Sequence, residues 1–340
     1  MTSPSDIGIC VVGTGRAGMI HARNFDGQVP GARVAAVADA VEESLAAAAE
    51  ALAPGFSHAD YREAIRAPGV DAVLIATPTA YHREIAVAAA ETGKHVFCEK
   101  PMAMNVAECD DMIRAAGKAG VKLQIGFMRR FDHGFRAAKR QMDAGAIGDV
   151  VAVKSLTHGP STPKRWMYDL EKSNGPLAEV NSHDIDTLRW FTGSEFRQVY
   201  AVAGNYRCPD ARDEFPDFYD NVSLVASFTN GMQGFIGGAV AVGYGYDARV
   251  EIVGAKGVLF VGRRPERDLV AAGADGEPDA AITASWRDLF SHAYLAEDKA
   301  FVRSIVDDVP PVVGGLDGKR AVEVVNAGNR SIREGIPITL

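Results

Sequence analysis

The residues whose spacing points most directly to chemistry are three glycines in the run Gly13-Thr14-Gly15-Arg16-Ala17-Gly18. The run follows the apolar segment 7–12 and opens a helical pattern, so that backbone N–H groups and the helix dipole would meet a pyrophosphate. Gly13 permits the tight turn, Gly15 lets the phosphate approach, and Gly18 lets the helix pack closely on the strand. This pattern predicts a dinucleotide-binding loop.

Asp39 is the acidic residue expected beyond such a loop. It ends the second apolar segment, about 20 residues after the last glycine, where a carboxylate can accept hydrogen bonds from ribose hydroxyls. A 2′-phosphate would meet the negative charge of Asp39, and the next residue, Ala40, offers no cation to neutralise that phosphate. The sequence therefore predicts NAD in preference to NADP.

Two further segments could carry a reaction. Lys100, in Glu99-Lys100-Pro101, follows a predicted strand at the edge where open α/β sheets bind ligands, although a lone lysine there is commonly only solvated. His183 follows Glu179 by four residues, so one helix would put both side chains on one face. The same pattern fits a helix cap with a buried, hydrogen-bonded histidine. The residues by themselves leave both interpretations open.

The elements that would position these residues alternate regularly in the first third of the chain. Short apolar segments alternate with Ala-rich amphipathic ones, which is typical of parallel βαβ units. The predicted strands are 7–12, 33–38, 70–76, 95–98 and 122–126. The predicted helices are 17–26, 41–51, 61–66, 83–92 and 106–119. We expect an α/β fold whose domain 1–126 is a doubly wound, parallel Rossmann sheet.

Beyond residue 126 strands follow one another with few helices, which predicts an α+β domain, 127–340, built on a large, mostly antiparallel open sheet. Asn230-Gly231 indicates a hairpin between two of its strands, and the polar stretch 263–278 is interpreted as a surface excursion. The predicted strands are 150–155, 199–204, 222–228, 233–242, 248–253 and 258–261. The predicted helices are 135–143, 183–191, 294–306 and 316–334, and the last can pack back on the first domain.

Composition restricts the class of protein. A net charge of -8 without a basic run argues against a nucleic-acid partner and favours a small molecule. No segment is apolar over the roughly 18 residues that a membrane helix needs, and the N-terminus lacks a basic leader. The four cysteines form no C-x-x-C pair and are interpreted as reduced packing thiols. We expect a cytoplasmic protein that uses no metal, since no His-Glu-x-x-His or comparable cluster is present.

Taken together, these motifs resemble the Gfo/Idh/MocA oxidoreductase family, named after glucose-fructose oxidoreductase, inositol dehydrogenase and rhizopine catabolism. The resemblance extends over nearly the whole chain, and the Arg129-Arg130-Phe131-Asp132 run is most similar to the inositol 2-dehydrogenase branch. It rests on the glycine loop through His21-Ala22, Ala76-Thr77-Pro78 with His82, Glu99-Lys100-Pro101, 126–132, the His183 segment through Trp190, and Tyr294.

The resemblance implies that Lys100 and His183 are catalytic. A histidine of near-neutral pKa suits a general base for a hydroxyl proton, and an ammonium beside the same oxygen would stabilise the developing alkoxide. The family also implies a cis Lys100-Pro101 bond. The residues expected to bind NAD are Gly13, Gly15, Arg16, Gly18, Asp39, Thr77, Pro78, His82 and Glu99.

Glu179 departs from the inositol dehydrogenases, which typically carry Asp at this position. The longer side chain could still orient His183 or relay its proton. The residues that the resemblance places around the substrate are Lys100, Arg130, His158, His183, Asp186 and Tyr294, a set suited to a ligand with several hydroxyls. The alternative is that Arg130 and Asp186 form structural ion pairs and that Tyr294 packs in the core.

The function expected from the resemblance is NAD-dependent oxidation of a secondary alcohol of a cyclic polyol or sugar, with myo- or scyllo-inositol as first choice. The alternatives are an aldose 1-dehydrogenase, a glycoside 3-dehydrogenase and a non-catalytic dinucleotide-binding regulator. The open second sheet presents a face that helices or another subunit must cover, so we expect a homo-oligomer, a dimer or the tetramer common in the family.

Overall fold

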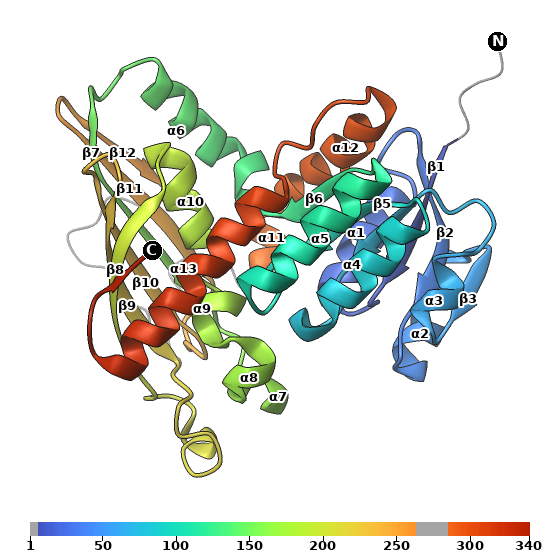
Figure 1. Ribbon diagram of the computed structural model, residues 1–340, viewed down its shortest axis with the longest axis horizontal. Helices are drawn as coiled ribbons and strands as arrows, with labels where there is room; N and C mark the ends of the chain where they lie inside the picture. Colours follow the sequence, from blue (N-terminus) through green and yellow to red (C-terminus); the bar gives the residue numbers. More distant parts are fainter. Residues whose placement is uncertain (1–5, 263–284) are drawn as a thin grey trace. The chain divides into compact units, whose positions relative to one another are not determined.

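The alternating segments of the first part of the chain form a parallel six-stranded sheet with the order β3-β2-β1-β4-β5-β6 (Figure 1). The computed structural model describes residues 6–262 and 285–340. This sheet belongs to a first unit of Met1–Met128 and His292–Lys319. Its strands are β1 (Ile7–Val12), β2 (Ala32–Ala38), β3 (Phe56–His58), β4 (Ala72–Ile75), β5 (His95–Glu99) and β6 (Leu123–Gly126).

Helices cover this sheet and close its core. A core cluster joins Phe25 and Phe97 to Phe301, and all three side chains are fully buried. The helices are α1 (Arg16–Phe25), α2 (Glu42–Leu52), α3 (Tyr61–Ala64), α4 (His82–Glu91), α5 (Val106–Ala119) and α12 (Ser291–Val306), with the short 3-10 helix η1 (Thr79–Tyr81) before α4. A segment from near the C-terminus, α12, therefore completes the core of the first unit.

The strand order reverses between β1 and β4, which is where ligands bind in sheets of this kind. All the strand pairs are parallel, so the carboxyl ends of the strands meet at one edge of the sheet. Gly13, Asp39 and Lys100 come directly after β1, β2 and β5. The predicted Rossmann sheet is confirmed, whereas the strand β3 was missed because its three residues form no apolar run.

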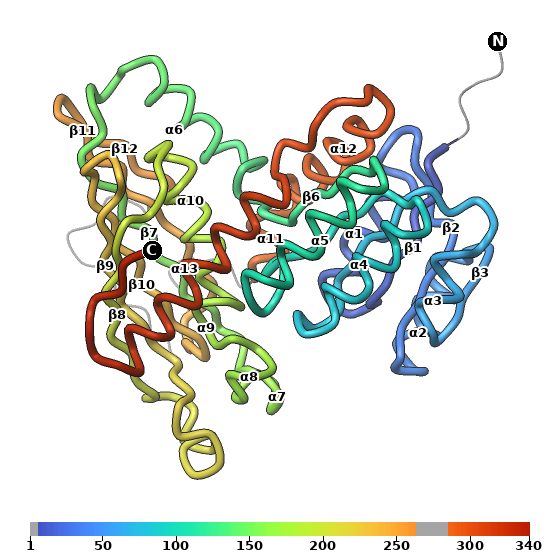
Figure 2. The backbone as a smooth tube through the Cα atoms, viewed as in Figure 1, coloured from blue at the N-terminus to red at the C-terminus, as the bar shows by residue number. Residues whose placement is uncertain are grey.

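The second unit, Arg129–Ser291 with Arg320–Leu340, is built on a seven-stranded sheet with the order β12-β11-β7-β10-β9-β8-β13. Figure 2 shows its central strands side by side. Only β7 and β10 pair in parallel among its strands in the described part of the chain, so the mostly antiparallel prediction is confirmed. The strands are β7 (Val150–His158), β8 (Phe196–Gly204), β9 (Asn221–Phe228), β10 (Gln233–Ala239), β11 (Asp247–Gly254), β12 (Val258–Val261) and β13 (Ile338–Thr339).

One face of this sheet is buried. The strand register places a row of buried side chains across it: Ala201, Leu224, Ile236, Ser155, Val250 and Val261. Helices α9 (Gly175–Glu179) and α10 (Ser182–Thr192) contact this face. Helix α13 (Gly315–Glu334) approaches closely at Gly328, where a Cβ would come within 2.8 Å of Leu177 and 3.2 Å of Leu224.

The predicted hairpin at Asn230-Gly231 is confirmed, but its loop is longer than a two-residue turn. Strands β9 and β10 pair from Ser227 with Gln233, and only the glycine of the pair has a positive φ, of 86°. The remaining helices are α6 (His133–Asp143), α7 (Arg165–Tyr168), α8 (Leu170–Ser173) and α11 (Trp286–Leu289), with η2 (Met128–Phe131) and η3 (Pro209–Ala211). The predicted excursion at 263–278 lies outside the described residues.

Candidate active site

The glycine loop has the geometry that close approach of a phosphate needs. Gly13 adopts φ +91°, and a Cβ there would lie 2.7 Å from the carbonyl of Ala76. A Cβ at Gly18 would lie 1.9 Å from the Gly13 oxygen. No atom lies within 4 Å of a Cβ built at Gly15, which caps α1 without a side-chain hydrogen bond. The loop therefore keeps open space at the N-terminus of a ten-residue helix.

Asp39 is held directly beside this loop. Its Oδ2 accepts hydrogen bonds from the Thr14 amide at 2.7 Å and the Thr14 hydroxyl at 2.9 Å, and its Oδ1 accepts from the Val41 amide at 2.9 Å. These bonds fix the carboxylate at the end of β2, where a ribose is expected. Arg16, in the first turn of α1, is exposed.

The segment after β4 lies next to the loop and is tied to the segment after β5. The His82 ring lies 2.8 Å from the Thr77 oxygen through Nε2 and 2.8 Å from the Pro101 oxygen through Nδ1. Burial lowers the pKa of His82 despite these backbone hydrogen bonds, so its neutral ring donates to one carbonyl at a time. Thr77 Oγ1 is buried and has no hydrogen-bond partner among the described residues, and Pro78 is exposed.

Glu99 orients the start of the segment that carries Lys100. Its Oε2 accepts a hydrogen bond from the Lys100 amide at 2.9 Å, and its Oε1 lies 3.1 Å from His21 Nε2. The Glu99 carboxyl is packed so closely that a Cβ on Gly126 would come within 3.1 Å of it. The Lys100-Pro101 peptide bond is cis, and the Lys100 side chain is half-buried.

Tyr294 lies in the first unit, on α12. Its side chain is 3% exposed, and its ring meets the His21 ring edge-on at a centroid distance of 5.3 Å. Tyr294 therefore packs in the core, as the alternative interpretation of this residue predicted. A contact between Tyr294 and substrate stays a prediction.

In the second unit, Glu179 and His183 do not share one helix. Glu179 ends α9, Val180 follows with φ -114° and ψ -54°, and α10 begins at Ser182 after the N-cap Asn181. Of the two interpretations left open by the sequence, a single helix carrying both side chains does not form, because Gly175 and Pro176 start a separate short helix that ends at Glu179. The helix predicted from residue 183 begins one residue earlier, at Ser182. His183 is therefore placed by the first turn of α10 alone, and it is buried there.

Asp184, next to His183, anchors this turn to β7. Its Oδ1 accepts hydrogen bonds from Arg129 at 2.8 Å, Ser155 at 2.5 Å and Thr157 at 2.9 Å, and its Oδ2 accepts one from Asn181 at 2.8 Å. Arg129 is 1% exposed. Burial alone lowers the pKa of Arg129, but the Asp184 carboxylate and the Tyr246 hydroxyl together outweigh that effect and raise the pKa. The pair is therefore a buried ion pair with additional hydrogen bonds.

A second pair lies beside the first in sequence. Arg130 Nε and Nη2 donate to the two oxygens of Asp186 at 2.9 Å and 2.6 Å, a bidentate geometry, and the Arg130 guanidinium lies 6.0 Å from the Trp190 ring centroid. His158, at the end of β7, makes a short contact with the Tyr244 hydroxyl. Burial lowers the pKa of His158, so its ring is neutral near pH 7.

Sequence reasoning missed Arg129, Asp184 and Asn181 as residues that support His183. One signal was present: two adjacent arginines, and two aspartates separated by one residue, which the fold joins as two ion pairs. Which arginine pairs with which aspartate depends on how α10 lies against η2, the 3-10 helix that carries both arginines, and no sequence period encodes that arrangement.

The first unit fits a dinucleotide. The open space at Gly15, the fixed Asp39 carboxylate and the unsatisfied Thr77 hydroxyl lie at the ends of β1, β2 and β4. No group of three or more His, Cys, Asp or Glu side chains in residues 6–262 and 285–340 is arranged to hold a metal ion. Fold and site together define a dinucleotide-binding oxidoreductase architecture.

Comparison with known proteins identifies the family. Residues 7–127 match the model of the GFO/IDH/MocA oxidoreductase family with an NAD-binding Rossmann fold, and residues 135–260 match the C-terminal domain of the same family. The chain belongs to the GFO/IDH/MocA family of NAD-dependent oxidoreductases. The family resemblance and the expected cofactor, NAD, are thereby confirmed.

Several similar proteins are named as inositol dehydrogenases. The chain is 33% identical to myo-inositol 2-dehydrogenase of Thermotoga maritima, with 96% of each chain covered. It is 31% identical to scyllo-inositol 2-dehydrogenase (NAD(+)) of Bacillus subtilis, with 97% of this chain and 95% of the other covered. A crystal structure of scyllo-inositol dehydrogenase from Lactobacillus casei with NAD(H) and scyllo-inositol matches with a TM-score of 0.86 and 27% identity, covering 98% of this chain and 99% of the other.

Proposed function

We propose that this protein oxidises a secondary alcohol of a cyclic polyol, with myo- or scyllo-inositol as the first choice, and transfers the hydride to NAD. The proposal rests on where the two candidate catalytic residues lie. Lys100 directly follows β5 at the carboxyl edge of the NAD-binding sheet, and His183 lies in a turn of α10 held by buried ion pairs. Relatives similar over the full chain are named as myo- and scyllo-inositol dehydrogenases.

In the proposed chemistry His183 accepts the proton of the reacting hydroxyl as general base. The Lys100 ammonium donates a hydrogen bond to the same oxygen and stabilises the alkoxide as it forms. NAD, when bound, supplies the acceptor for the hydride that leaves the alcohol carbon. Glu99 fixes the Lys100 amide, and Asp184 fixes the turn that carries His183.

Glu179 retains a supporting role in this proposal. It ends the helix before α10, so it would act on the proton of His183 from a neighbouring turn. Asp at this position would keep the carboxylate but shorten the side chain by one methylene. Glu179→Asp, the residue typical of inositol dehydrogenases, is therefore expected to keep more activity than Glu179→Ala.

The substrate would be recognised by groups with several hydrogen-bonding positions. The Arg130–Asp186 pair offers a guanidinium and a carboxylate in fixed orientation, and the neutral His158 ring offers a further donor or acceptor. A ligand with adjacent hydroxyls satisfies such groups, whereas one that lacks a hydroxyl leaves them unpaired at a free-energy cost. A contact from Tyr294 completes the proposed set.

A substrate panel tests the proposal. NADH formation would be measured with inositol isomers, aldopyranoses and glycosides at equal concentrations. The highest kcat/KM is expected for myo- or scyllo-inositol. A preference for an aldopyranose would identify an aldose 1-dehydrogenase, and one for a glycoside a 3-dehydrogenase. Tight NAD binding with no turnover on any compound would indicate a dinucleotide-binding regulator.

The proposal extends to the two units and to assembly. Residues 1–126 would bind NAD, and residues 127–340 would bind substrate and a second copy of the chain. On the face opposite the buried row, Tyr200, Val225, Phe235, Lys154, Glu251 and Phe260 form a row across six strands. Val225 is 50% and Phe260 51% exposed. Such a row is typical of a sheet face covered by another subunit.

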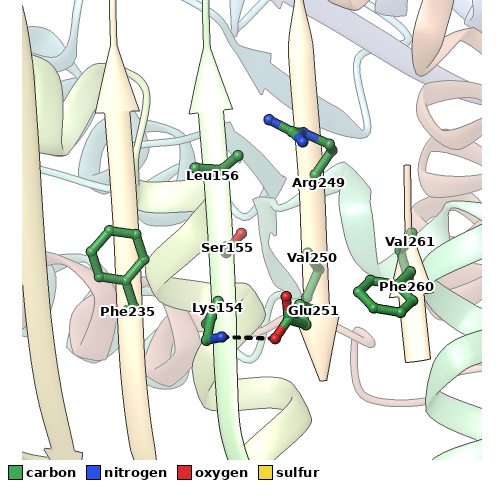
Figure 3. Close-up of a pocket in the computed structure, with 9 residues that line it drawn as sticks. All are labelled: Lys154, Ser155, Leu156, Phe235, Arg249, Val250, Glu251, Phe260 and Val261. Atoms are coloured by element: carbon green, nitrogen blue, oxygen red, sulfur yellow. Dashed lines mark hydrogen bonds and ion pairs between the residues drawn. The ribbon is translucent and has the colours of Figure 1, made fainter. Parts of the chain in front are cut away.

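That face is hollowed toward the edge of the sheet formed by β12. A pocket of about 310 Å³ lies over strands β7, β10, β11 and β12, with the Lys154–Glu251 ion pair of 2.7 Å across it (Figure 3). The rings of Phe235 and Phe260 lie on either side of that pair. A dimer or tetramer that stacks this face against its copy would bury both rings.

The cellular location belongs to the same proposal. In the described part of the chain no helix is long and apolar enough to cross a membrane. All four cysteines are free and buried, which is typical of proteins in a reducing compartment. We therefore infer a cytoplasmic enzyme, which cell fractionation would check.

A further inference from the structure

The first unit contains a buried histidine, His21, to which neither the glycine-loop motif nor the proposed chemistry assigns a role. His21 lies on α1, one turn beyond the glycine loop, and its side chain is completely buried. Its Nδ1 lies 2.6 Å from Asp298 Oδ1, and its Nε2 lies 3.1 Å from Glu99 Oε1. The ring therefore bridges two carboxylates from different elements, β5 and α12.

The chain of contacts continues to Lys100. The Glu99 oxygen that does not face His21 accepts the hydrogen bond from the Lys100 amide at 2.9 Å. A carboxylate held at both oxygens cannot rotate without losing one of these bonds. The orientation of the His21 ring thus fixes the Glu99 carboxylate, and the carboxylate fixes the position of the Lys100 backbone amide.

The other side of the ring is anchored as firmly. Asp298 Oδ2 accepts a hydrogen bond from Asn24 Nδ2 at 2.7 Å, so His21 and Asn24, one helical turn apart, bind the same carboxylate. The rings of Phe97 and Tyr294 meet the imidazole edge-on at centroid distances of 5.0 Å and 5.3 Å. These rings help to exclude water from the cluster.

The electrostatics favour a charged ring. Burial by itself lowers the pKa of His21, but the charges and hydrogen bonds of Asp298 and Glu99 outweigh it and raise the pKa well above its usual value. Burial also favours the neutral form of Glu99, yet the His21 hydrogen bond and charge lower the Glu99 pKa. Burial raises the pKa of Asp298. The groups that face the ring are thus Glu99 from β5, and Asp298 and Tyr294 from α12.

We propose that His21 is a positioning residue for Lys100: its ring orients Glu99, Glu99 fixes the Lys100 amide, and Asp298 anchors the ring to α12. This clamp, made of His21, Glu99 and Asp298, links the helix of the glycine loop to the proposed catalytic lysine. The proposal rests on the proposed function only in giving Lys100 a role in turnover. The contacts of the clamp are independent of that role.

The test compares His21→Gln and Asp298→Asn with the wild-type chain. His21→Gln keeps hydrogen-bonding atoms but removes the ring and its charge, and Asp298→Asn keeps the shape of the side chain while removing one carboxylate. His95→Gln is the matched control, since His95 is a half-buried histidine at the other end of β5 whose Nδ1 accepts a hydrogen bond from the Lys122 amide. Urea titration of each variant establishes that it is folded.

The readout that does not depend on turnover is NMR of lysines dimethylated with ¹³C-formaldehyde. The Lys100 signal is assigned by its loss in Lys100→Ala. We expect it to shift in His21→Gln and to stay at its wild-type position in His95→Gln. An unchanged Lys100 signal in folded His21→Gln would overturn the proposal, even if the chain proved to have another activity.

The kinetic readout is a split between kcat and KM. His21→Gln is expected to lower kcat by about tenfold or more, because a small displacement of a reacting group is costly, while KM for NAD changes by less than about threefold. A kcat equal to wild type in folded His21→Gln would contradict the proposal. If the wild-type chain oxidises no polyol, the proposed function fails, and the NMR result alone decides on the clamp.

The pH dependence gives a third readout. Since the pKa of His21 is higher in the folded chain, its contribution to stability is complete below the unfolded pKa and is lost as pH rises through the folded pKa. Asp298→Asn removes one of the two negative charges that raise the pKa of His21. The loss of stability and the accompanying fall in kcat should therefore begin at a lower pH in this variant. Identical pH profiles for wild type and Asp298→Asn would count against the clamp.

Discussion

Lys100 is the single residue on which the proposed chemistry depends most directly. Lys100→Ala removes the ammonium that would stabilise the alkoxide, and losses of about 10²–10³ in kcat are typical when one such donor is removed. The Kd for NAD should stay close to wild type, since the phosphates are expected at the glycine loop and not at Lys100. Steady-state NADH formation and fluorescence titration measure the two quantities.

The matched control is Lys118→Ala, because Lys118 is an exposed lysine in the last turn of α5. It should have wild-type kcat and Kd. If Lys100→Ala turned over as fast as this control, Lys100 would have no part in the reaction.

Asp39 decides between the two dinucleotides in our interpretation. Asp39→Ala should weaken NAD binding by about 10- to 100-fold, because hydrogen bonds to a charged group contribute roughly 1.5–3 kcal/mol each. Binding of NADP should weaken less, since repulsion of its 2′-phosphate is removed. Fluorescence titration with NADH and NADPH gives both values of Kd.

Asp39 also accepts hydrogen bonds from Thr14, so a second variant is needed. Asp39→Asn keeps an acceptor for Thr14 and removes the charge, and it should narrow the preference for NAD with the loop intact. Asp26→Ala, an exposed acid at the end of α1, serves as control. An unchanged NAD-to-NADP ratio in both Asp39 variants would refute the assignment.

At the scale of elements, the buried Arg129–Asp184 pair joins η2 to α10. Arg129→Met leaves the Asp184 charge buried without its cation, and breaking a buried pair in this way typically costs about 3–5 kcal/mol. The double variant Arg129→Met/Asp184→Asn should recover part of that loss, because no buried charge remains. The free energy of unfolding from urea titration measures both effects.

Arg114→Met is the comparison for an exposed ion pair, that of Arg114 with Asp111, and should change stability little. The two side chains are not coupled if the double variant loses as much free energy of unfolding as Arg129→Met and Asp184→Asn lose together.

The helix of the glycine loop gives a second prediction at this scale. Gly18→Ala would place a Cβ 1.9 Å from the Gly13 oxygen, so α1 must move away from β1. NAD binding should be lost, or weakened by more than about 100-fold, as the phosphate loop is displaced. Isothermal titration calorimetry measures this affinity.

Gly117→Ala is the matched control in a helix. No atom lies within 4 Å of a Cβ at Gly117 on α5, and alanine is favoured over glycine in a helix by up to about 1 kcal/mol. This variant should bind NAD like wild type and be slightly more stable. Normal NAD affinity in Gly18→Ala would disprove the close-packing role of Gly18.

At the scale of the whole molecule, the open face of the second sheet predicts assembly. Val225→Lys/Phe260→Lys puts two charges into the exposed row and should convert the proposed oligomer into a smaller species without unfolding it. Light scattering after size exclusion measures the mass. Val312→Lys, at an even more exposed apolar site outside both sheets, should leave the mass unchanged. A wild-type monomer would refute the assembly.

Much of the fold was predictable, because local patterns determine it. The apolar pattern of segment 7–12 predicts a strand, and the structure has β1 there. The glycines predict the turn that follows, and Asp39 comes directly after β2 as expected. Elements without a pattern were missed: the three-residue β3 and the short helices α7, α8, α9 and α11, which local turns and tertiary contacts define. The site roles of Glu179 and His183 stay predictions.

The sequence by itself determined the dinucleotide loop, NAD as the cofactor and the family, because each depends on residue types at short, fixed spacings. The preference for NAD over NADP stays a prediction. Only the tertiary structure decided which distant residues support them. His21 meets Asp298 and Arg129 meets Asp184 because helices dock on sheets, and that docking depends on side-chain packing over the whole core. Partners separated by 277 and 55 positions leave no local periodicity in the sequence.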